Sequence, residues 1–428
     1  VATPWMDDYL SPAMQAAAAC RETGETKVYA RRAEVWLLEL TLVAETVSRA
    51  TGWAEAKCRV WLGRALGIWL FLFGLFIVSA AIQLALALPM VAYFHRLSVT
   101  GLSANVLATP IITMAIPAGF LAVLTGWGWA AELAALMLDA GAGIVAWHGA
   151  WEPYWRMPDP PYWLALSWAV STAALGVALV ARKWRMAAFG VNLAILAVVV
   201  IHPFEARLEH GYLELAAIDV GQAESLHVAL PNGGSMLVDA GGFAGPRGEQ
   251  RTRLDPGEDV VSPYLWYRGI KRLEAVAISH FHSDHCGGLR AVMKNFRPKE
   301  LWVGRIPPDV RAGVQQWAAE SGTKVRLLRE GERVNLGGVE FEALAPGADM
   351  PERAASNNDS LVLRARFGRH VFLLTGDIEK IVERHLVDSG AGLGAQVLKV
   401  AHHGSARSNL AEFLDAVRPA VALISAAG

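Results

Sequence analysis

The chain has little of what marks a disulfide-rich protein or a basic nucleic-acid-binding domain. It has three cysteines among 428 residues, and none of them forms a CxxC pair. This scarcity excludes a disulfide framework and a zinc ribbon. Lys and Arg number 39 and Asp and Glu number 40, so the net charge of −1 excludes a globally basic binder of nucleic acid. No GxSxG frame occurs, so a serine nucleophile on such a turn is not indicated.

What the chain has in excess is apolar residues. Hydrophobic residues make up 54% of the chain and charged residues 18%, which predicts membrane segments. The length suggests two or three domains. The first residue is Val1, and the last stretch, "PAVALISAAG", stops just after an expected strand. We therefore expect a fragment that is open at both ends.

Four apolar runs without acidic or basic residues fill most of the first half. They are residues 66–94, 102–129, 162–181 and 186–202. The first exceeds the roughly 20 residues that a helix needs to cross a bilayer, and we predict that it and 162–181 span the membrane. The stretch 130–151 carries Glu132, Asp139 and His148. It either spans as well or lies at the interface as an amphipathic helix.

Basic residues predict the orientation of these helices. Lys57, Arg59 and Arg64 precede the first run, and "RKWR" (182–185) directly precedes the last. If 130–151 spans, both clusters fall on one side, which the positive-inside rule makes cytoplasmic. If it does not span, the cluster at 182–185 still adjoins the last run. In both cases we place the chain after residue 203 outside the cytoplasm.

The remaining parts of the chain have two different sequence patterns. Residues 1–65 are mixed, and 34–50 has the apolar spacing of an amphipathic helix, so we assign an amphipathic or linker region there. From residue 211 onward, short β-rich runs alternate with helical stretches and Gly-rich turns, which is typical of a water-soluble α/β domain.

One segment of this second half concentrates possible metal ligands. "AVAISHFHSDHCGG" (275–288) is a buried-strand pattern followed by His280, His282, Asp284 and His285. Residues two apart on an extended strand share a side, so His280 and His282 can meet one point, while Asp284 and His285 follow a turn and can reach a second. Imidazoles and a carboxylate suit zinc, iron or manganese.

Two distant strand ends offer further ligands. In "FLLTGDIE" a strand pattern is followed by Asp377, and in "LKVAHHGS" a strand pattern is followed by His402 and His403. If these strand ends meet the 280–285 cluster, a carboxylate could bridge two metals and one more imidazole could complete a shell. Two metals about 3.5–4 Å apart are suited to hydrolysis, because they activate water and stabilise a leaving oxygen.

The motifs resemble those of a known family. "HFHSDH" is the complete HxHxDH signature of the metallo-β-lactamase superfamily. "IDVGQAES" (218–225), "MLVDAGG", "NNDSLVLR", "FLLTGD" and "LKVAHHGS" follow in the order found in ComEC-type DNA-internalisation proteins, and residues 81–113 are similar to the membrane competence region of that family. The resemblance covers about residues 66 to 425.

The resemblance implies a multi-domain protein: a polytopic α-helical membrane region at 66–202 and an αβ/βα metallo-β-lactamase-like sandwich at 211–428, truncated at its C-terminus. It implies a multi-pass protein of the bacterial inner membrane, in contact with lipid, that passes single-stranded DNA inward with other DNA-uptake proteins while the sandwich hydrolyses DNA. Two divalent ions, zinc or manganese, are expected.

The same resemblance assigns the residues of the site. His280 and His282 would bind one metal, Asp284 and His285 the second, and Asp377 would bridge, with Asp284 and Asp377 also catalytic. His402 or His403 would complete a shell, and Asp239 would orient the loop. Two features depart from the family. Ala223 and Glu224 stand where Gly and Asp are usual, and a third histidine has no obvious counterpart; Asn357, Asn358 and Asp359 are the candidate substitutes.

Two alternative functions remain open at this point. The chain could be a membrane-tethered metallo-hydrolase of another ester, or a DNA channel whose hydrolase domain is not catalytic. Arginines near the motifs, among them Arg364, Arg366 and Arg407, could contact phosphates, although a solvated surface is the commoner explanation.

Overall fold

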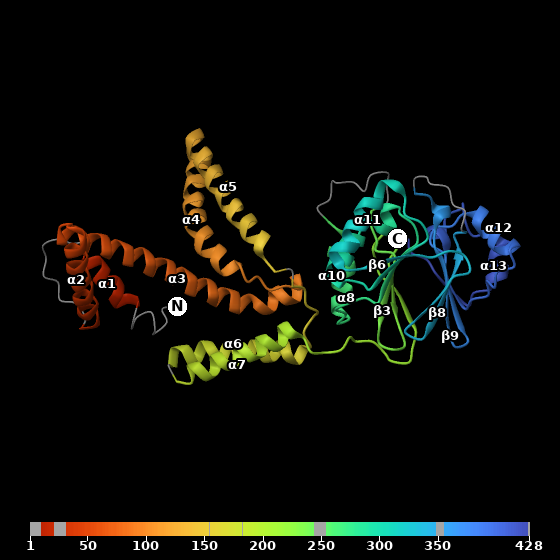
Figure 1. The fold of residues 1–428 in the computed structure, drawn as a ribbon, viewed down its shortest axis with the longest axis horizontal. Helices are drawn as coiled ribbons and strands as arrows, with labels where there is room; N and C mark the ends of the chain where they lie inside the picture. Colours follow the sequence, from red (N-terminus) through yellow and green to blue (C-terminus); the bar gives the residue numbers. More distant parts are fainter. Residues whose placement is uncertain are drawn as a thin grey trace. The chain divides into compact units, whose positions relative to one another are not determined.

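The structure is a computed structural model that describes residues 10–20, 31–153, 155–181, 183–243, 254–347 and 355–426. The chain divides into two compact units (Figure 1). The helical unit comprises residues 1–155 and 160–202, and the α/β unit comprises residues 156–159 and 203–428. Part of the basic stretch used above for orientation, Arg182, lies outside the described residues.

The helical unit has seven α-helices in its described part. They are α1 (Ser11–Ala19), α2 (Arg31–Thr51), α3 (Glu55–Phe94), α4 (Gly101–Thr125), α5 (Gly128–Trp151), α6 (Tyr162–Ala181) and α7 (Arg185–Ile201). By length and composition, α3, α4, α5 and α6 can each cross a membrane, and α7 is a shorter apolar helix. Helix α5 covers residues 130–151 and is long and apolar enough for the spanning alternative.

Helix α3 begins earlier than its apolar run. Residues 55–65 form its first turns, although we expected them to belong to the amphipathic region. These residues contain no proline, so nothing interrupts the backbone hydrogen bonds before the uncharged segment begins. Pro89 lies inside α3, and Pro110 and Pro117 lie inside α4. Prolines are tolerated there as they are in other membrane helices.

Polar contacts join neighbouring helices of this unit. Asn192 of α7 donates to the hydroxyls of Ser171 and Thr172 on α6, both at 3.0 Å. The Glu152 carboxylate, after α5, accepts the backbone N–H groups of Val99 and Thr100 at the start of α4 at 2.7 and 2.9 Å. Such contacts satisfy polar groups in an apolar surrounding and fix helix pairs.

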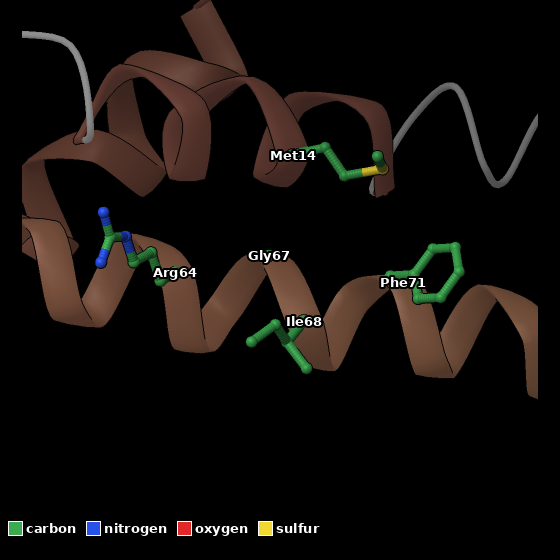
Figure 2. Close-up of a pocket in the computed structure, with 5 residues that line it drawn as sticks. All are labelled: Met14, Arg64, Gly67, Ile68 and Phe71. Atoms are coloured by element: carbon green, nitrogen blue, oxygen red, sulfur yellow. The ribbon is translucent and has the colours of Figure 1, made fainter. Parts of the chain in front are cut away.

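A small cavity of about 390 Å³ lies between α1 and α3 (Figure 2). Its lining combines one charged group with apolar side chains and a glycine: Met14, Arg64, Gly67, Ile68 and Phe71. Beside it, Leu10 and Ala13 pack against Leu70 and fasten α1 to α3.

The α/β unit contains two six-stranded sheets. The first sheet has the order β1-β2-β3-β4-β5-β6 and the second β12-β11-β10-β9-β8-β7. The strands of the first are β1 (Glu214–Ala217), β2 (Leu226–Ala229), β3 (Ser235–Val238), β4 (Ala275–Ile278), β5 (Glu300–Val303) and β6 (Lys324–Leu327). Those of the second are β7 (Arg333–Leu336), β8 (Val339–Ala345), β9 (Val362–Phe367), β10 (His370–Leu374), β11 (Val397–Lys399) and β12 (Val421–Leu423).

Helices cover the outer face of each sheet, giving an αβ/βα sandwich (Figure 1). The first sheet carries α8 (Ser262–Tyr267), α10 (Leu289–Phe296) and α11 (Pro308–Ser321), and the second carries α12 (Lys380–Asp388) and α13 (Ala411–Val417). Strands β3–β6 are parallel to one another, as are β10–β12. This architecture agrees with the predicted fold class.

Strand alternation explains the three packed layers. In β4, Val276 and Ile278 belong to the apolar cluster under the helices, whereas Ala275 and Ala277 belong to the cluster between the sheets. A third cluster joins the second sheet to α12 and α13 and includes Leu398 and Phe413. Because successive side chains of a strand point to opposite faces, an entirely apolar strand such as β4 can serve two layers.

Candidate metal centre

The segment after β4 forms a compact loop. His282 precedes the four-residue helix α9 (Ser283–Cys286), which brings Asp284 and His285 onto one turn. His280 Nε2 lies 2.9 Å from His282 Nδ1, and the ring centroid of His280 lies 4.3 Å from that of His285. His280 and His285 are buried, and His282 and Asp284 are half-buried.

Glycines allow other backbone segments to approach this loop. A Cβ on Gly242 would lie 1.6 Å from the carbonyl oxygen of Ser283. A Cβ on Gly288 would lie 2.4 Å from the carbonyl oxygen of Ala240. No larger residue fits at either position, so these glycines let the turn after β3 pack directly against the loop.

The second sheet supplies the remaining candidate ligands. Asp377 follows β10 after Gly376, which has a φ of 55° and on which a Cβ would lie 2.7 Å from Ser279 Cβ. His402 and His403 follow β11, and both have left-handed backbone angles, with φ values of 52° and 54°. Two consecutive non-glycine residues in this region are uncommon, and such strain is concentrated at functional sites.

Four side chains from the two sheets converge on one point. Asp284, His285, Asp377 and His403 each place one ligand atom within 4.8 Å of the other three. Asp377 Oδ2 lies 3.3 Å from His285 Nε2 and 3.6 Å from His403 Nε2. Asp284 Oδ2 lies 3.7 Å from His403 Nε2. Residues 92 or more positions apart in the sequence therefore meet at the rim of the sandwich.

Hydrogen bonds on the far side of each imidazole leave the near nitrogen free. His285 Nδ1 donates to Asp239 Oδ2 at 2.8 Å, and His403 Nδ1 donates to the Ser425 carbonyl at 2.7 Å. Within the described part of the chain, His285 Nε2, His403 Nε2 and Asp377 Oδ1 are buried without a hydrogen-bond partner. Two imidazole nitrogens beside two carboxylates are the donor set that a divalent transition-metal ion prefers, so the residues fit such an ion.

The electrostatics of the cluster favour ionised carboxylates. Burial by itself would raise the pKa of Asp377, but the close contact with His285 and the charges of the neighbouring histidines lower that pKa well below its usual range. Burial would also raise the pKa of Asp284, but the contact with His403 and the charge of His285 lower that pKa below its usual value. The pKa of His280 is lowered far below its usual value, first by burial and then by the charge of His285.

Two of the seven predicted ligands, His280 and His282, lie outside the four-residue group, and one lies at its edge. Among the described residues, no cluster of three ligand atoms includes His280 and His282. His402 is 23% exposed and places its Nε2 3.9 Å from Asp377 Oδ2, outside the four-residue group. Of the two histidines that the sequence left undecided, the geometry therefore favours His403.

The side chains considered as substitutes for a third histidine are engaged elsewhere. Asp359 forms a buried ion pair with Arg305. Asn357 and Asn358 donate to the Glu379 carboxylate at 3.4 and 3.2 Å. Two of the arginines considered for DNA contact are also paired, Arg364 with Glu342 and Arg366 with Glu340.

Several residues that support the loop were not identified from the sequence. Ser279 contacts the Nδ1 atoms of His280 and His285 at 3.1 and 3.2 Å and donates to Asp239. Ser360 Oγ accepts the Asp377 N–H at 3.1 Å. Asp239, which was expected to orient the loop, accepts hydrogen bonds from both Ser279 and His285. Small hydroxyl residues next to a motif carry no signal that distinguishes such roles from ordinary turn residues.

Comparison with known families matches both halves of the chain. Residues 35–204 match the Competence protein family, and residues 219–428 match the metallo-β-lactamase superfamily. The chain has the domain composition of a ComEC-type competence protein. With its four membrane-compatible helices, it is a membrane protein that carries a metallo-hydrolase fold.

Individual relatives of the ComEC type cover much of the chain. ComE operon protein 3 of Bacillus subtilis is 30% identical over 82% of this chain and 46% of its own length. Competence protein ComA of Neisseria gonorrhoeae is 33% identical over 48% of this chain and 26% of its own length. The chain thus spans less than half of these relatives.

Solved structures align with part of the chain. The Rm3 metallo-β-lactamase aligns with 45% of this chain and 77% of its own, with a TM-score of 0.30 and 17% identity. The metallo-β-lactamase fold protein YhfI from Bacillus subtilis aligns with 50% and 86%, with a TM-score of 0.33 and 13% identity.

Proposed function

We propose that this chain acts in DNA uptake and that its α/β unit hydrolyses DNA phosphodiester bonds with two divalent ions, zinc or manganese. The observation that carries the proposal is the convergence of Asp284, His285, Asp377 and His403, with buried lone pairs facing one point. The competence match over residues 35–204 supports DNA as the substrate.

The protein side chains would divide the work as follows. His285 and His403 would bind one ion through Nε2. Asp377, which contacts both of these histidines, would be shared with the ion held by His280 and His282. Divalent ions at this centre would lower the pKa of a water molecule and hold phosphoryl oxygens, as phosphodiester hydrolysis requires. Asp284 is 19% exposed whereas Asp377 is 2% exposed, so we assign proton transfer to the Asp284 carboxylate.

The two metal positions would differ in strength. The position at Asp284, His285, Asp377 and His403 has four converging ligands. The position at His280 and His282 has two imidazole nitrogens 2.9 Å apart and would share Asp377 with the first position, but among the described residues no tight cluster of three ligand atoms includes the pair. We therefore assign the tighter site to the four-residue group and the more exchangeable site to the histidine pair.

The membrane part supports an inner-membrane location with the α/β unit outside the cytoplasm. Four candidate spans, α3 to α6, separate Lys57, Arg59 and Arg64 from Lys183 and Arg185. An even number of crossings places both basic clusters on one side, which would be cytoplasmic. If α7 then crosses, the α/β unit follows on the opposite side. Single-stranded DNA, lipid and other DNA-uptake proteins are the partners that this arrangement implies.

The test is metal-dependent cleavage by the whole chain in lipid nanodiscs. We expect the parent to cut single-stranded DNA in the presence of Mn²⁺ or Zn²⁺, and Asp284→Ala to abolish cutting. Asp415→Ala, which removes an exposed carboxylate from α13, is the matched control and should cut normally.

The same preparation distinguishes the alternative functions. Cleavage of a lactone or a cell-envelope phosphodiester but not of DNA would show a hydrolase of another ester. Metal-loaded protein that binds DNA without cutting it would show a non-catalytic domain. Undiminished DNA cutting by Asp284→Ala would contradict the proposed site itself.

A further inference from the structure

A fully buried ion pair joins the two sheets beneath the candidate metal centre. Glu224 stands just before β2 of the first sheet, and Lys399 is the last residue of β11 in the second. The Lys399 ammonium contacts the Glu224 carboxylate, and the two side chains are 0% and 1% exposed. The residues are 175 positions apart in the sequence.

Stability alone does not account for this pair. Removing two charges from water costs several kcal/mol each, and a buried ion pair is often no more stabilising than two packed apolar side chains of similar size. The layer between the two sheets contains apolar side chains such as Leu226 and Leu374. A charged pair at this position therefore calls for a role in arranging its surroundings.

Glu224 contacts the metal loop through both its backbone and its carboxylate. Its N–H donates to the Asp284 carbonyl at 3.1 Å, and its carbonyl accepts the Gly241 N–H at 2.8 Å. Its carboxylate oxygen lies within 4.8 Å of ligand atoms of both Asp239 and His285. A displacement of Glu224 would therefore move the backbone of Asp284 and the surroundings of His285.

Lys399 is connected in the same way to the ligands of the second sheet. Its carbonyl accepts the Thr375 hydroxyl at 2.7 Å, two residues before Asp377. Its ammonium also donates to the Val400 carbonyl at 3.0 Å, at the start of the segment that carries His402 and His403. Since the ammonium is buried and occupied by these acceptors, it does not reach substrate.

We propose that Glu224 and Lys399 are positioning residues that set the spacing between the ligands of the first sheet, Asp284 and His285, and those of the second, Asp377 and His403. This inference rests on the metal centre of the proposed function. It also gives a role to Glu224, which stands where the resembled family usually has Asp.

The experiment measures Mn²⁺ binding, independently of any cleavage. The metal-stripped whole chain in nanodiscs is titrated with Mn²⁺, and free Mn²⁺ is followed by its EPR signal. Asp377→Ala defines the background from other weak sites. The variant Glu224→Gln keeps the side-chain volume but removes the charge, and we expect its Mn²⁺ dissociation constant to rise at least tenfold, as for other groups that support metal ligands.

A double variant separates positioning from stability. Glu224→Met with Lys399→Met should keep an unfolding temperature within a few degrees of the parent without metal, because an apolar pair can replace a buried ion pair. It should still bind Mn²⁺ at least tenfold more weakly. The matched control is Glu214→Met with Arg268→Met, which removes an ion pair of 2.7 Å elsewhere in the α/β unit and should leave Mn²⁺ binding unchanged.

The outcomes distinguish this inference from the proposed function. Parent-like Mn²⁺ affinity in Glu224→Gln or in the folded double variant would overturn the positioning role and leave the metal centre intact. A parent chain that binds Mn²⁺ no better than Asp377→Ala would overturn the metal centre, and the positioning role with it. If the double variant does not fold, Glu224→Gln decides the question alone.

Discussion

Replacing Asp239 with asparagine should disable His285 as a ligand while preserving the fold. Asp239 Oδ1 accepts the Ser279 N–H at 2.7 Å, and Oδ2 accepts the Ser279 hydroxyl and His285 Nδ1–H, both at 2.8 Å. Asparagine can keep the first bond. Its NH₂ group, however, must donate where Oδ2 accepted, so the proton of His285 is displaced to Nε2. A protonated Nε2 has no lone pair for a metal.

The magnitude follows from the bonds that change. Groups that orient metal-bound histidines are typically worth 10- to 100-fold in metal affinity, or about 1.4–2.8 kcal/mol. Losing a hydrogen bond to a charged group costs about 1.5–3 kcal/mol of stability. Asp239 has a φ of 59°, a left-handed conformation that Asn adopts as readily as Asp, so no backbone strain is added.

The assay is Mn²⁺ titration of the whole chain alongside thermal unfolding without metal. Glu342→Gln is the matched control, because it also neutralises a carboxylate in an ion pair, on β8 away from the centre. Asp239→Asn with parental Mn²⁺ affinity would refute the tautomer argument. A loss of affinity equal to that of Glu342→Gln would show that general destabilisation, not His285, is responsible.

Three further predictions follow from individual residues. His403→Ala should weaken Mn²⁺ binding at least tenfold more than His402→Ala, and equal effects in the titration would contradict the assignment of His403. Burial, assisted by Arg268, lowers the pKa of His227 to about 4. The unfolded chain protonates His227 below about pH 6.5, whereas the folded chain protonates it only near pH 4. The free energy of unfolding should therefore fall by about 3 kcal/mol as the pH is lowered from 6.5 toward 4. Denaturation at several pH values should show this loss, and His227→Gln should reduce it. Gly242→Ala should lower metal affinity by distorting the loop at Ser283. Unchanged Mn²⁺ binding would show that the loop accommodates the added methyl group without displacing the ligands.

The apolar strand β4 could be predicted from the sequence, whereas the edge strands β6 and β7 could not. The run at β4 is entirely apolar and is bounded by turn residues, so its length and composition identify a buried strand. Strands β6 and β7 have sequences KVRL and RVNL and form the edges of the two sheets. Their alternation of charged and apolar residues over four positions is too short to distinguish from a loop, so the sequence alone does not identify them.

The candidate ligands were identifiable, but their grouping was not. HxHxDH is local, and the positions of Asp377, His402 and His403 after strands were enough to expect them at the rim. The choice between His402 and His403 depends on the Ser425 carbonyl, which follows β12 and lies 22 residues from His403 in the sequence. The separation of the His280 and His282 pair from the four-residue group likewise depends on the turn of α9, which spacing alone does not determine.

The ion pair of Glu224 and Lys399 shows why support for a site is harder to read than the site itself. A metal ligand must be one of a few residue types, so a cluster of them is improbable by chance and is visible in the sequence. A group that positions a ligand needs only the right charge or shape at the right place, and Glu and Lys are common everywhere. Its meaning lies in burial and in the contact across two sheets, which the sequence does not display. Departures from a family motif, such as Ala223 and Glu224, are therefore best interpreted through the partner that the fold brings to them.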